Sequence, residues 1–567
     1  MSNKLKYKDI FFFLIPAVLL FALRIWLARI SGLWYPADQL YDDSLMMRYA
    51  DFSEHFSARN SPFYELLLKN MGFPLLLNLV GISGFDYTDV LSLFWFLAAI
   101  STVALFAKST GVNSRIIWLA IYIFVLFVPA AFDNWCGTRL YRNAVLTPLY
   151  FIVLNMAAIL FVHHFTSSTF SIKKFLPFQI FLGLIFTLTF YIKEDGIWLL
   201  AVLIAALIPC IIKALVQRNF SIKNKFFHVA LLLLPLMIFG AGTSFYKLVN
   251  YKYFGVYEIN TRTGGETGKF VNLVYKIASN ERTSKIWAPH DAILAAINAS
   301  KTLKNNSTLT EAILHSPWCG GDMAANPIRG DFLGWVIMTA IKDSGTCNSL
   351  VEQENFFRQV NKEIELAFAN GTLKKDSKIQ LVSSMGGRNL LQILKLSGLM
   401  AEQYIMHVAL YGYAPGAYPM RASQPQNSDQ EIFIATASRL TNIDLTKTDD
   451  NAGRAQEILS VMFMIYSMIQ MALFVMALFG LKYNIIKIWR RQEIKSLLPI
   501  LITAGFLILS LAYTLALAWF CEYISPHELR NAALKFYSIG LVPMLITFEI
   551  FGTYLFYSDY KNITIFK

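Results

Sequence analysis

Long apolar runs separated by short polar segments are the dominant pattern of this chain. A run of about 20 apolar residues is long enough to cross the hydrocarbon core of a bilayer as a helix. The pattern therefore predicts an all-α polytopic membrane protein with about ten transmembrane helices. We expect these spans near residues 10–31, 88–107, 116–133, 144–163, 175–192, 196–213, 226–247, 457–481, 496–520 and 534–557.

A shorter apolar run at residues 73–83 lies between the first two long runs. It is shorter than a usual span, and its length alone leaves its position ambiguous. We predict a helix at the membrane interface, inside a first outer loop of residues 32–87. Counting this run as a span would also move Lys108 and Arg115 to the other side of the membrane from the remaining basic loops.

The distribution of charge predicts an orientation. Of the 567 residues, 56% are hydrophobic and only 15% are charged, and the formal net charge is +13. Lys and Arg concentrate in the cytoplasmic loops of membrane proteins, and a cytoplasmic N-terminus puts every clearly basic short loop on that side. We therefore predict a multi-pass protein of the cytoplasmic (inner) membrane with both termini in the cytoplasm. The orientation of the chain in the lipid bilayer already explains the excess of Lys and Arg in its short loops. No nucleic-acid partner is therefore expected.

Three parts follow from this arrangement. Residues 1–247 form a first transmembrane module, residues 248–456 form a mostly helical extracytoplasmic domain, and residues 457–567 form the C-terminal transmembrane helices. Cys319 and Cys347 both lie in the inserted domain. A disulfide between them suits an oxidising compartment, and two free thiols fit the sequence equally well.

The first group of candidate functional residues is Tyr41-Asp42-Asp43, shortly after the first span. Paired carboxylates can take the proton from a hydroxyl group or bind a cation. The alternative is structural, because Asp42-Asp43-Ser44 would also cap the N-terminus of a helix well. The two interpretations are compatible.

Two arginines on the predicted outer face form the second group. Arg139 and Arg142 directly precede the run at 144–163, and residues three apart share one face of a helix. Guanidinium groups suit phosphate oxygens. Anchoring at the interface is the alternative, although arginines on the outer side run against the positive-inside trend.

The third group is Lys193-Glu194-Asp195-Gly196, between two apolar runs with almost no loop. A tight turn explains Asp195 and Gly196. A turn does not require Lys193 and Glu194 as well, which favours a functional role. A fourth group, His527-Glu528-Leu529-Arg530, precedes the last span. Arg530 is a candidate phosphate ligand there, and His527 is either a general acid or base or an ordinary loop residue.

Together these residues resemble the GT-C superfamily of integral-membrane glycosyltransferases, which includes aminoarabinose transferases, protein O-mannosyltransferases and oligosaccharyltransferases. The resemblance covers roughly residues 10–250. The chain is most similar to bacterial members that have an Asp-Asp first loop and a charged Gly-Ile-Trp hairpin. It is carried by Tyr41-Asp42-Asp43 and then Lys69-Asn70-Met71-Gly72-Phe73-Pro74.

The resemblance implies a donor sugar carried on a polyprenyl phosphate. It also implies a first-loop general base, which maps to Asp42, with Asp43 as the second candidate. Many members carry an acidic residue in the second outer loop, and Asp133 is the nearest candidate here. A divalent cation is the one cofactor left open, and no metal ligand is assigned.

We therefore expect a hexosyltransferase-like enzyme that inverts the configuration at the anomeric carbon of the sugar. It would transfer the sugar to an extracytoplasmic glycan, lipid or protein. The lipid phosphate would be held by Arg139, Arg142, Lys193 and Arg530, with Tyr41, Lys69, Glu194 and Asp195 as further substrate-binding candidates. One alternative is a transporter of an anionic or lipid-linked solute, which would carry charges near the bilayer midplane. Another is a non-catalytic scaffold for assembly of a surface polymer.

Overall fold

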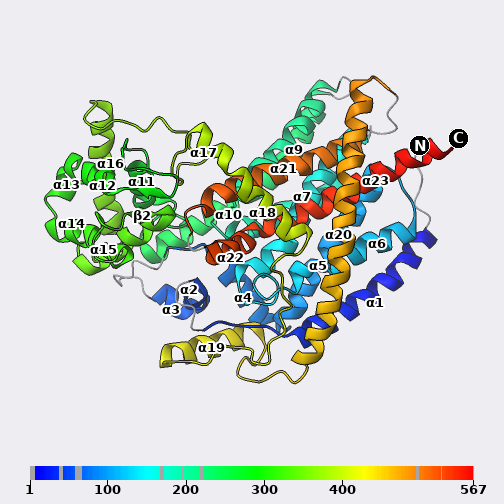
Figure 1. Ribbon diagram of the computed structural model, residues 1–567, viewed down its shortest axis with the longest axis horizontal. Helices are drawn as coiled ribbons and strands as arrows, with labels where there is room; N and C mark the ends of the chain where they lie inside the picture. Colours follow the sequence, from blue (N-terminus) through cyan, green and yellow to red (C-terminus); the bar gives the residue numbers. More distant parts are fainter. Residues whose placement is uncertain are drawn as a thin grey trace.

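The computed structural model describes residues 7–37, 42–57, 67–166, 172–194, 196–217, 221–492, 497–524 and 527–565. Nearly all of its regular structure is helical (Figure 1). Within these residues, nine helices are long and apolar enough to cross a membrane. The predicted class, an all-α polytopic membrane protein, is confirmed. The long helices are α1 (Tyr7–Ser31), α5 (Tyr87–Thr110), α7 (Arg142–Thr166), α8 (Ile172–Ile192), α9 (Ile197–Val216), α10 (Ile222–Phe254), α20 (Ala452–Trp489), α21 (Leu497–Cys521) and α23 (Leu541–Ile565), the last preceded by α22 (His527–Tyr537) and η4 (Ser538–Gly540).

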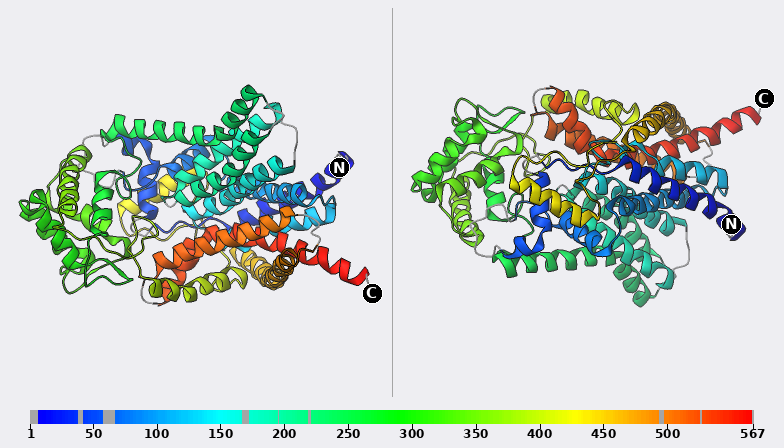
Figure 2. Two further views of the ribbon diagram at one scale, coloured as in Figure 1. Left: turned by 90° about the horizontal axis from the view of Figure 1, so that it is seen from above. Right: turned by 90° about the horizontal axis from the view of Figure 1, so that it is seen from below.

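The two ends of the drawn chain lie at the same end of the helix bundle. Figure 2 shows this in both views, with the green helices of the inserted region at the opposite end. The fold therefore separates a membrane-like bundle from a body that projects beyond it.

The predicted span at 116–133 is wrong in length. Its helix, α6 (Arg115–Leu126), has only 12 residues. At about 1.5 Å per residue it covers about 18 Å, well short of a hydrocarbon core of about 30 Å. Pro129 follows and opens a short 3-10 turn, η1 (Pro129–Ala131), because proline cannot supply the hydrogen bond that would continue the helix.

Side chains from other helices satisfy the carbonyl groups at the end of α6. The Tyr466 hydroxyl donates to the Phe124 carbonyl at 2.9 Å, and Arg24 donates to the Leu126 carbonyl. A backbone carbonyl without a partner is costly at membrane depth. These contacts explain how an apolar helix can end inside the bundle, and they are invisible to hydropathy.

The segment between α1 and α5 folds into three short helices, as far as the structure describes it. They are α2 (Asp42–Ala50), α3 (Phe52–Ser57) and α4 (Gly72–Ser83). The 12-residue helix α4 is apolar but too short to be a candidate span. It packs against α2, α5 and α8. The predicted helix over 73–83 is therefore present and shorter than a span, and its position at the membrane interface stays a prediction.

The first part of the inserted region has a hydrophobic core of its own. Trp287, Val336 and Phe357 are buried in it, and Trp519 at the end of α21 joins the same core. Its elements are α11 (Gly265–Val274), β1 (Ile286–Ala288), α12 (His290–Ala299), α13 (Lys301–Lys304), α14 (Ser307–Leu314), η2 (Pro317–Cys319), β2 (Ile328–Arg329), η3 (Gly330–Phe332), α15 (Leu333–Ser344), α16 (Leu350–Ala369) and α17 (Leu390–Lys395). The two short strands pair antiparallel.

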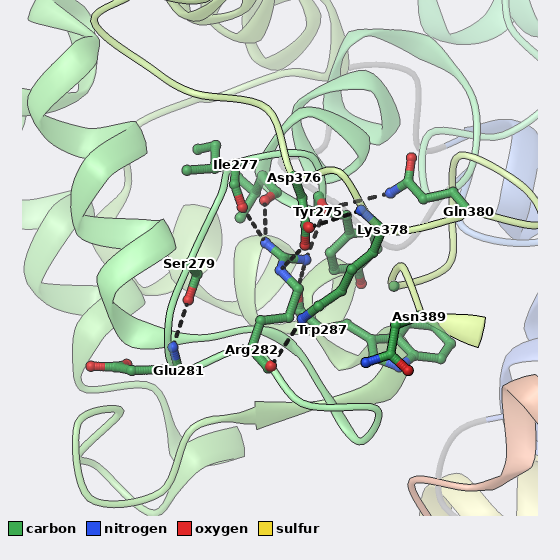
Figure 3. A network of polar contacts seen from close by, with 12 residues as sticks. Tyr275, Ile277, Ser279, Glu281, Arg282, Trp287, Asp376, Lys378, Gln380 and Asn389 are labelled. Atoms are coloured by element: carbon green, nitrogen blue, oxygen red, sulfur yellow. Dashed lines mark hydrogen bonds and ion pairs between the residues drawn. The ribbon is translucent and has the colours of Figure 1, made fainter. Parts of the chain in front are cut away.

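Arg282 organises one edge of this core (Figure 3). Its guanidinium donates to the carbonyls of Tyr275 at 2.7 Å and Ile277 at 2.7 Å, and its Nε lies 3.2 Å from the carboxylate of Asp376. An arginine buried in this way is structural, because its charge and most of its donors are used inside the domain.

The second part of the inserted region returns to the bundle. Helix α18 (Ser397–Val408) packs on α20, α21, α22 and α23, and α19 (Ser428–Thr441) packs on α2 and α4. Between them, residues 409–423 form a strap that contacts the segment after α1 and the segment after α6. The amide of Tyr35 donates to the Arg421 carbonyl at 2.8 Å, and the amide of Gly416 donates to the Phe132 carbonyl at 2.8 Å.

Cys319 and Cys347 are both free and buried. Both belong to the core of the inserted region. Of the two alternatives left open by the sequence, the structure has the one with free thiols.

Candidate functional site

Four of the predicted site features lie wholly or partly outside the described residues. Tyr41 and Asp195 are not described. Asp42 begins helix α2, but its side chain is outside the description, as is that of His527. The site is therefore built from the remaining candidates and from the residues that surround them.

Asp43 and Arg139 form a buried ion pair. The Arg139 Nη2 atom lies 2.5 Å from Asp43 Oδ2, and its Nε donates to Oδ1 at 3.2 Å. Their side chains are 3% and 7% exposed. An isolated β-bridge also pairs Trp34, which follows α1, with Arg139. A two-pronged pair of this kind fixes orientation as well as charge.

Glu194 and Arg142 form a second buried pair. Arg142 Nη1 donates to both carboxylate oxygens of Glu194, at 3.0 and 2.8 Å, and the amide of Asn70 donates to Oε1 at 3.2 Å. Burial opposes ionisation of this carboxyl, but the positive charges of Arg142, Lys69 and Arg262 outweigh it and lower its pKa to about 2. Glu194 is therefore a carboxylate at neutral pH.

Close backbone packing explains why Lys69 and Asn70 reach this pair. A side chain at Gly72 would place its Cβ 2.4 Å from the carbonyl carbon of Tyr191, so only glycine lets the start of α4 touch the end of α8. The segment before α4 is thereby held against the Lys193-Glu194 turn.

Arg262 comes to the same place from the inserted region, and the sequence did not single it out. The amide of Thr261 donates to the Leu67 carbonyl at 2.8 Å, and Asn260 donates to Asn70 Oδ1 at 2.9 Å. Arg262 lies 3.6 Å from Asp331. The inserted region therefore contributes directly to the site.

Trp335 joins the two cations from different parts of the chain. Lys69 Nζ lies 5.4 Å from the ring centroid and Arg262 Cζ lies 5.5 Å from it, which are cation–π distances. We call this group the Glu194 cluster. It comprises Lys69, Arg142, Glu194, Arg262, Asp331 and Trp335.

Lys193 lies beside this cluster, whereas Arg530 is not joined to it. Lys193 is buried, and its Nζ lies 4.9 Å above the ring of Tyr537. Arg530 is half-buried in the first turn of α22, and its Nε has no hydrogen-bond partner. No hydrogen bond or ion pair links Arg530 to the cluster within the described part of the chain.

Asp133 and Lys535 form a third buried ion pair, and only Asp133 of the two was predicted from the sequence. Lys535 Nζ lies 3.1 Å from Asp133 Oδ1, and the Asp133 carboxylate also accepts from the amides of Trp135 at 2.9 Å and Ala414 at 3.0 Å. Asp133 thus connects its loop, the 409–423 strap and the helix α22. Lys535 looks like an ordinary helix-end lysine in the sequence, which is why it gave no signal.

The described carboxylates do not fit a divalent cation. Within the described ranges, no group of three or more His, Cys, Asp or Glu side chains could hold a metal ion. Asp43 and Asp133 are each already neutralised by a cationic side chain.

The Glu194 cluster and its neighbour Lys193 combine four cationic side chains with two carboxylates. Arg142 and Glu194 are nearly fully buried, so their fields are weakly screened. The arrangement suits an anion with several oxygen atoms, such as a phosphate, between the bundle and the inserted region. No family model, curated protein or solved structure matches this chain.

Proposed function

We propose that this protein is a GT-C-type glycosyltransferase that transfers a sugar from a polyprenyl-phosphate donor to an extracytoplasmic acceptor. The observation that supports this proposal best is the cationic Glu194 cluster at the junction of the bundle and the inserted region. A donor of this kind has a long apolar chain, which requires a bilayer, and a phosphate, which requires cations.

Arg142, Lys69 and Arg262 are the phosphate ligands in this proposal. As the acceptor oxygen bonds to the anomeric carbon, the bond from that carbon to the phosphate oxygen breaks and the phosphate gains negative charge. Fixed cations in a partly dry site stabilise that charge most effectively. Glu194 holds Arg142 in position through two hydrogen bonds and so orients it before the donor arrives.

Asp42 is the general base of the proposal. It would take the proton of the acceptor hydroxyl as the new glycosidic bond forms, with inversion at the anomeric carbon. Its neighbour Asp43 has both oxygens bound to Arg139, so Asp43 serves to position the first turn of α2. The same contact makes Arg139 a positioning residue, although its sequence pattern suggested a phosphate ligand.

The orientation belongs to the proposal as well. The bundle end that carries the Glu194 cluster would face the outside of a bacterial inner membrane, with both termini in the cytoplasm. The basic short loops support this orientation. The acceptor would be a cell-surface glycan, a lipid or a protein that reaches the site beside the inserted region.

Single substitutions in the first loop test the proposal. Strains carrying Asp42→Asn, Asp43→Asn or the control Glu54→Gln are compared by mass spectrometry of their surface glycans. Glu54 lies in the same loop with a side chain 58% exposed. We expect Asp42→Asn to remove one glycan while Glu54→Gln leaves the profile unchanged. An unchanged glycan profile in Asp42→Asn cells, at normal levels of the mutant protein, would refute the proposal that the protein is an enzyme.

Transport of an anionic solute is the second candidate, favoured by two ionisable side chains inside candidate spans. Arg24 and Glu549 are 2% and 0% exposed. Gln470 donates to Glu549 Oε1 at 3.3 Å, and Oε2 has no partner. Ionisable groups at membrane depth often mark a solute pathway. Uptake of labelled phosphate into proteoliposomes, abolished by Glu549→Gln, would favour transport over sugar transfer.

A further inference from the structure

Helix α18 exposes a row of apolar side chains that continues back onto α17. Its members are three or four residues apart, as residues on one face of a helix are. The three large members, two leucines and one isoleucine, are 66%, 62% and 57% exposed. A contiguous exposed apolar face marks a surface that something else covers. We call this row the apolar stripe, and its members are Leu390, Leu394, Gly398, Ala401 and Ile405.

The polar side chains of α18 turn inward, towards the helix bundle. Gln403 and His407 are 0% and 2% exposed. Gln403 Nε2 donates to the Thr514 carbonyl at 3.0 Å. The two ring nitrogens of His407 lie 2.6 Å from the Ser538 hydroxyl and 2.7 Å from the Tyr413 hydroxyl. Helix α18 is therefore inverted relative to a surface helix in water, which buries its apolar face and exposes its polar one.

Helix α16 belongs to the same inserted region and shows the opposite pattern. Arg358, Lys362 and Glu365 are exposed on it, whereas Phe357 and Ile364 are buried. This is the arrangement expected of a helix whose outer face meets water. The two helices of one region are thus built for different surroundings.

Helix α18 lies against the middle of a candidate span (Figure 2). The hydroxyl groups of Tyr404 and Ser510 are 2.6 Å apart. Ser510 is 11 residues from Cys521 at the end of α21, or about 16 Å at about 1.5 Å per residue. The 25 residues of α21 cover about 37 Å, somewhat more than a hydrocarbon core of about 30 Å. A point about 16 Å from the end of α21 therefore lies inside that core.

Exposed apolar side chains of α21 lie at the same depth. Ile508 and Leu511, close to Ser510 in the chain, are 66% and 43% exposed. Side chains exposed at this level of a membrane-spanning helix contact lipid. A second helix at the same level meets the same surroundings, so bilayer lipid is the partner that fits the apolar stripe.

The carbonyl groups just beyond α18 have side-chain donors. Ser467, well inside the candidate span α20, donates to the Ala409 carbonyl at 3.0 Å. Lys535 Nζ donates to the Gly412 carbonyl at 2.7 Å. A helix that ends at membrane depth requires such partners, because no water is present to replace them.

We propose that α17 and α18 form a re-entrant segment whose apolar stripe contacts the acyl chains of the bilayer. With 12 residues, α18 is too short to cross the membrane. It enters along α21, and the 409–423 strap leads the chain back to the segment after α1. The inserted region, predicted from the sequence to lie outside the membrane, is in this proposal partly embedded in it. The proposal does not depend on sugar transfer.

Single cysteines that carry a fluorophore test the segment in the full-length protein. Ile405→Cys and Leu394→Cys place the label on the apolar stripe. Ile508→Cys on α21 is the reference for lipid, and Leu366→Cys on α16 is the reference for water. The Leu366 and Ile508 side chains are 65% and 66% exposed, so the two references differ in surroundings and not in exposure. The native cysteines are buried, and wild type treated with the same reagent measures their background.

Each labelled protein is placed in nanodiscs that hold one copy, and two quenchers are compared. Lipids brominated in the middle of the acyl chain quench from the hydrocarbon core, and iodide quenches from water. We expect the Ile405→Cys label to lose as much fluorescence in brominated lipid as the Ile508→Cys label and none with iodide. The Leu366→Cys label should respond only to iodide. The Leu394→Cys label decides the matter in the same way if Ile405→Cys fails to fold.

Two results would overturn the proposal. Quenching of the stripe labels by iodide and not by brominated lipid would show that α18 faces water. Quenching by neither agent would show that protein covers the stripe.

Discussion

Replacing Glu194 by Gln should destabilise the protein strongly and in a pH-dependent way. The substitution keeps the shape of the side chain and removes its charge, so the guanidinium of Arg142 stays buried without a carboxylate. The pKa of Glu194 is lowered from an ordinary 4.5 to about 2. At about 1.4 kcal/mol per pKa unit, this lowering corresponds to a loss of about 3 kcal/mol in the free energy of unfolding at pH 7.

The sign of the pH dependence follows from the lowered pKa. A carboxyl whose pKa is lower in the folded protein contributes stability that is complete above its unfolded pKa. That contribution falls as the pH drops from about 4.5 towards about 2, where the folded carboxyl takes up its proton. The difference between wild type and Glu194→Gln should therefore be constant near neutrality and shrink below about pH 4.5.

The assay is denaturant unfolding in mixed micelles at pH 7 and in steps down to pH 3. Glu365→Gln is the control, because Glu365 pairs with Lys269 at 2.9 Å with both side chains more than 40% exposed. An exposed pair contributes about 0–1 kcal/mol. Equal losses for Glu194→Gln and Glu365→Gln, or a Glu194→Gln effect that does not change with pH, would refute the electrostatic account of the site.

Three further predictions concern packing and burial. Asp133→Asn should lower the free energy of unfolding by about 3–5 kcal/mol, because Lys535 keeps its buried charge, and adding Lys535→Met should recover much of it; no recovery would argue against the ion pair. Gly72→Ala should cost about 1–3 kcal/mol through contact with α8, measured as a shift of the unfolding midpoint, and an unchanged midpoint would contradict that contact. Cys319 and Cys347 should resist maleimide until the protein unfolds, since burial raises the pKa of the Cys347 thiol to about 11 and also raises that of Cys319; rapid labelling of the native protein would show that these thiols are accessible.

Much of the candidate site could be predicted because charge is rare beside apolar runs. Arg142 and Glu194 stand out in the sequence for that reason, and they pair in the structure. The same logic selected Arg139 and Asp43. It could not predict that these two would bind each other, because the residues that meet are 96 positions apart in the chain.

Other parts of the site depend on contacts that leave no local signal. Lys535 meets Asp133 across 402 positions, and Arg262 reaches the site only because the inserted region pairs with the segment at Leu67. The prediction of a full span at 116–133, where α6 has only 12 residues, failed for a related reason. Hydropathy measures the apolar character of a run, whereas its end is decided by Pro129 and by side chains from α1 and α20.

The most direct test of sugar transfer is to follow a polyprenyl-phosphate sugar in proteoliposomes that contain the purified protein and an extract of the cell envelope. The account predicts that wild type releases polyprenyl phosphate while a sugar-modified acceptor forms, and that Asp42→Asn does neither although it folds normally. An active wild type whose rate is unchanged by Asp42→Asn and by Arg142→Gln would contradict the assigned site. A wild type that consumes no lipid-linked sugar donor would contradict the function itself.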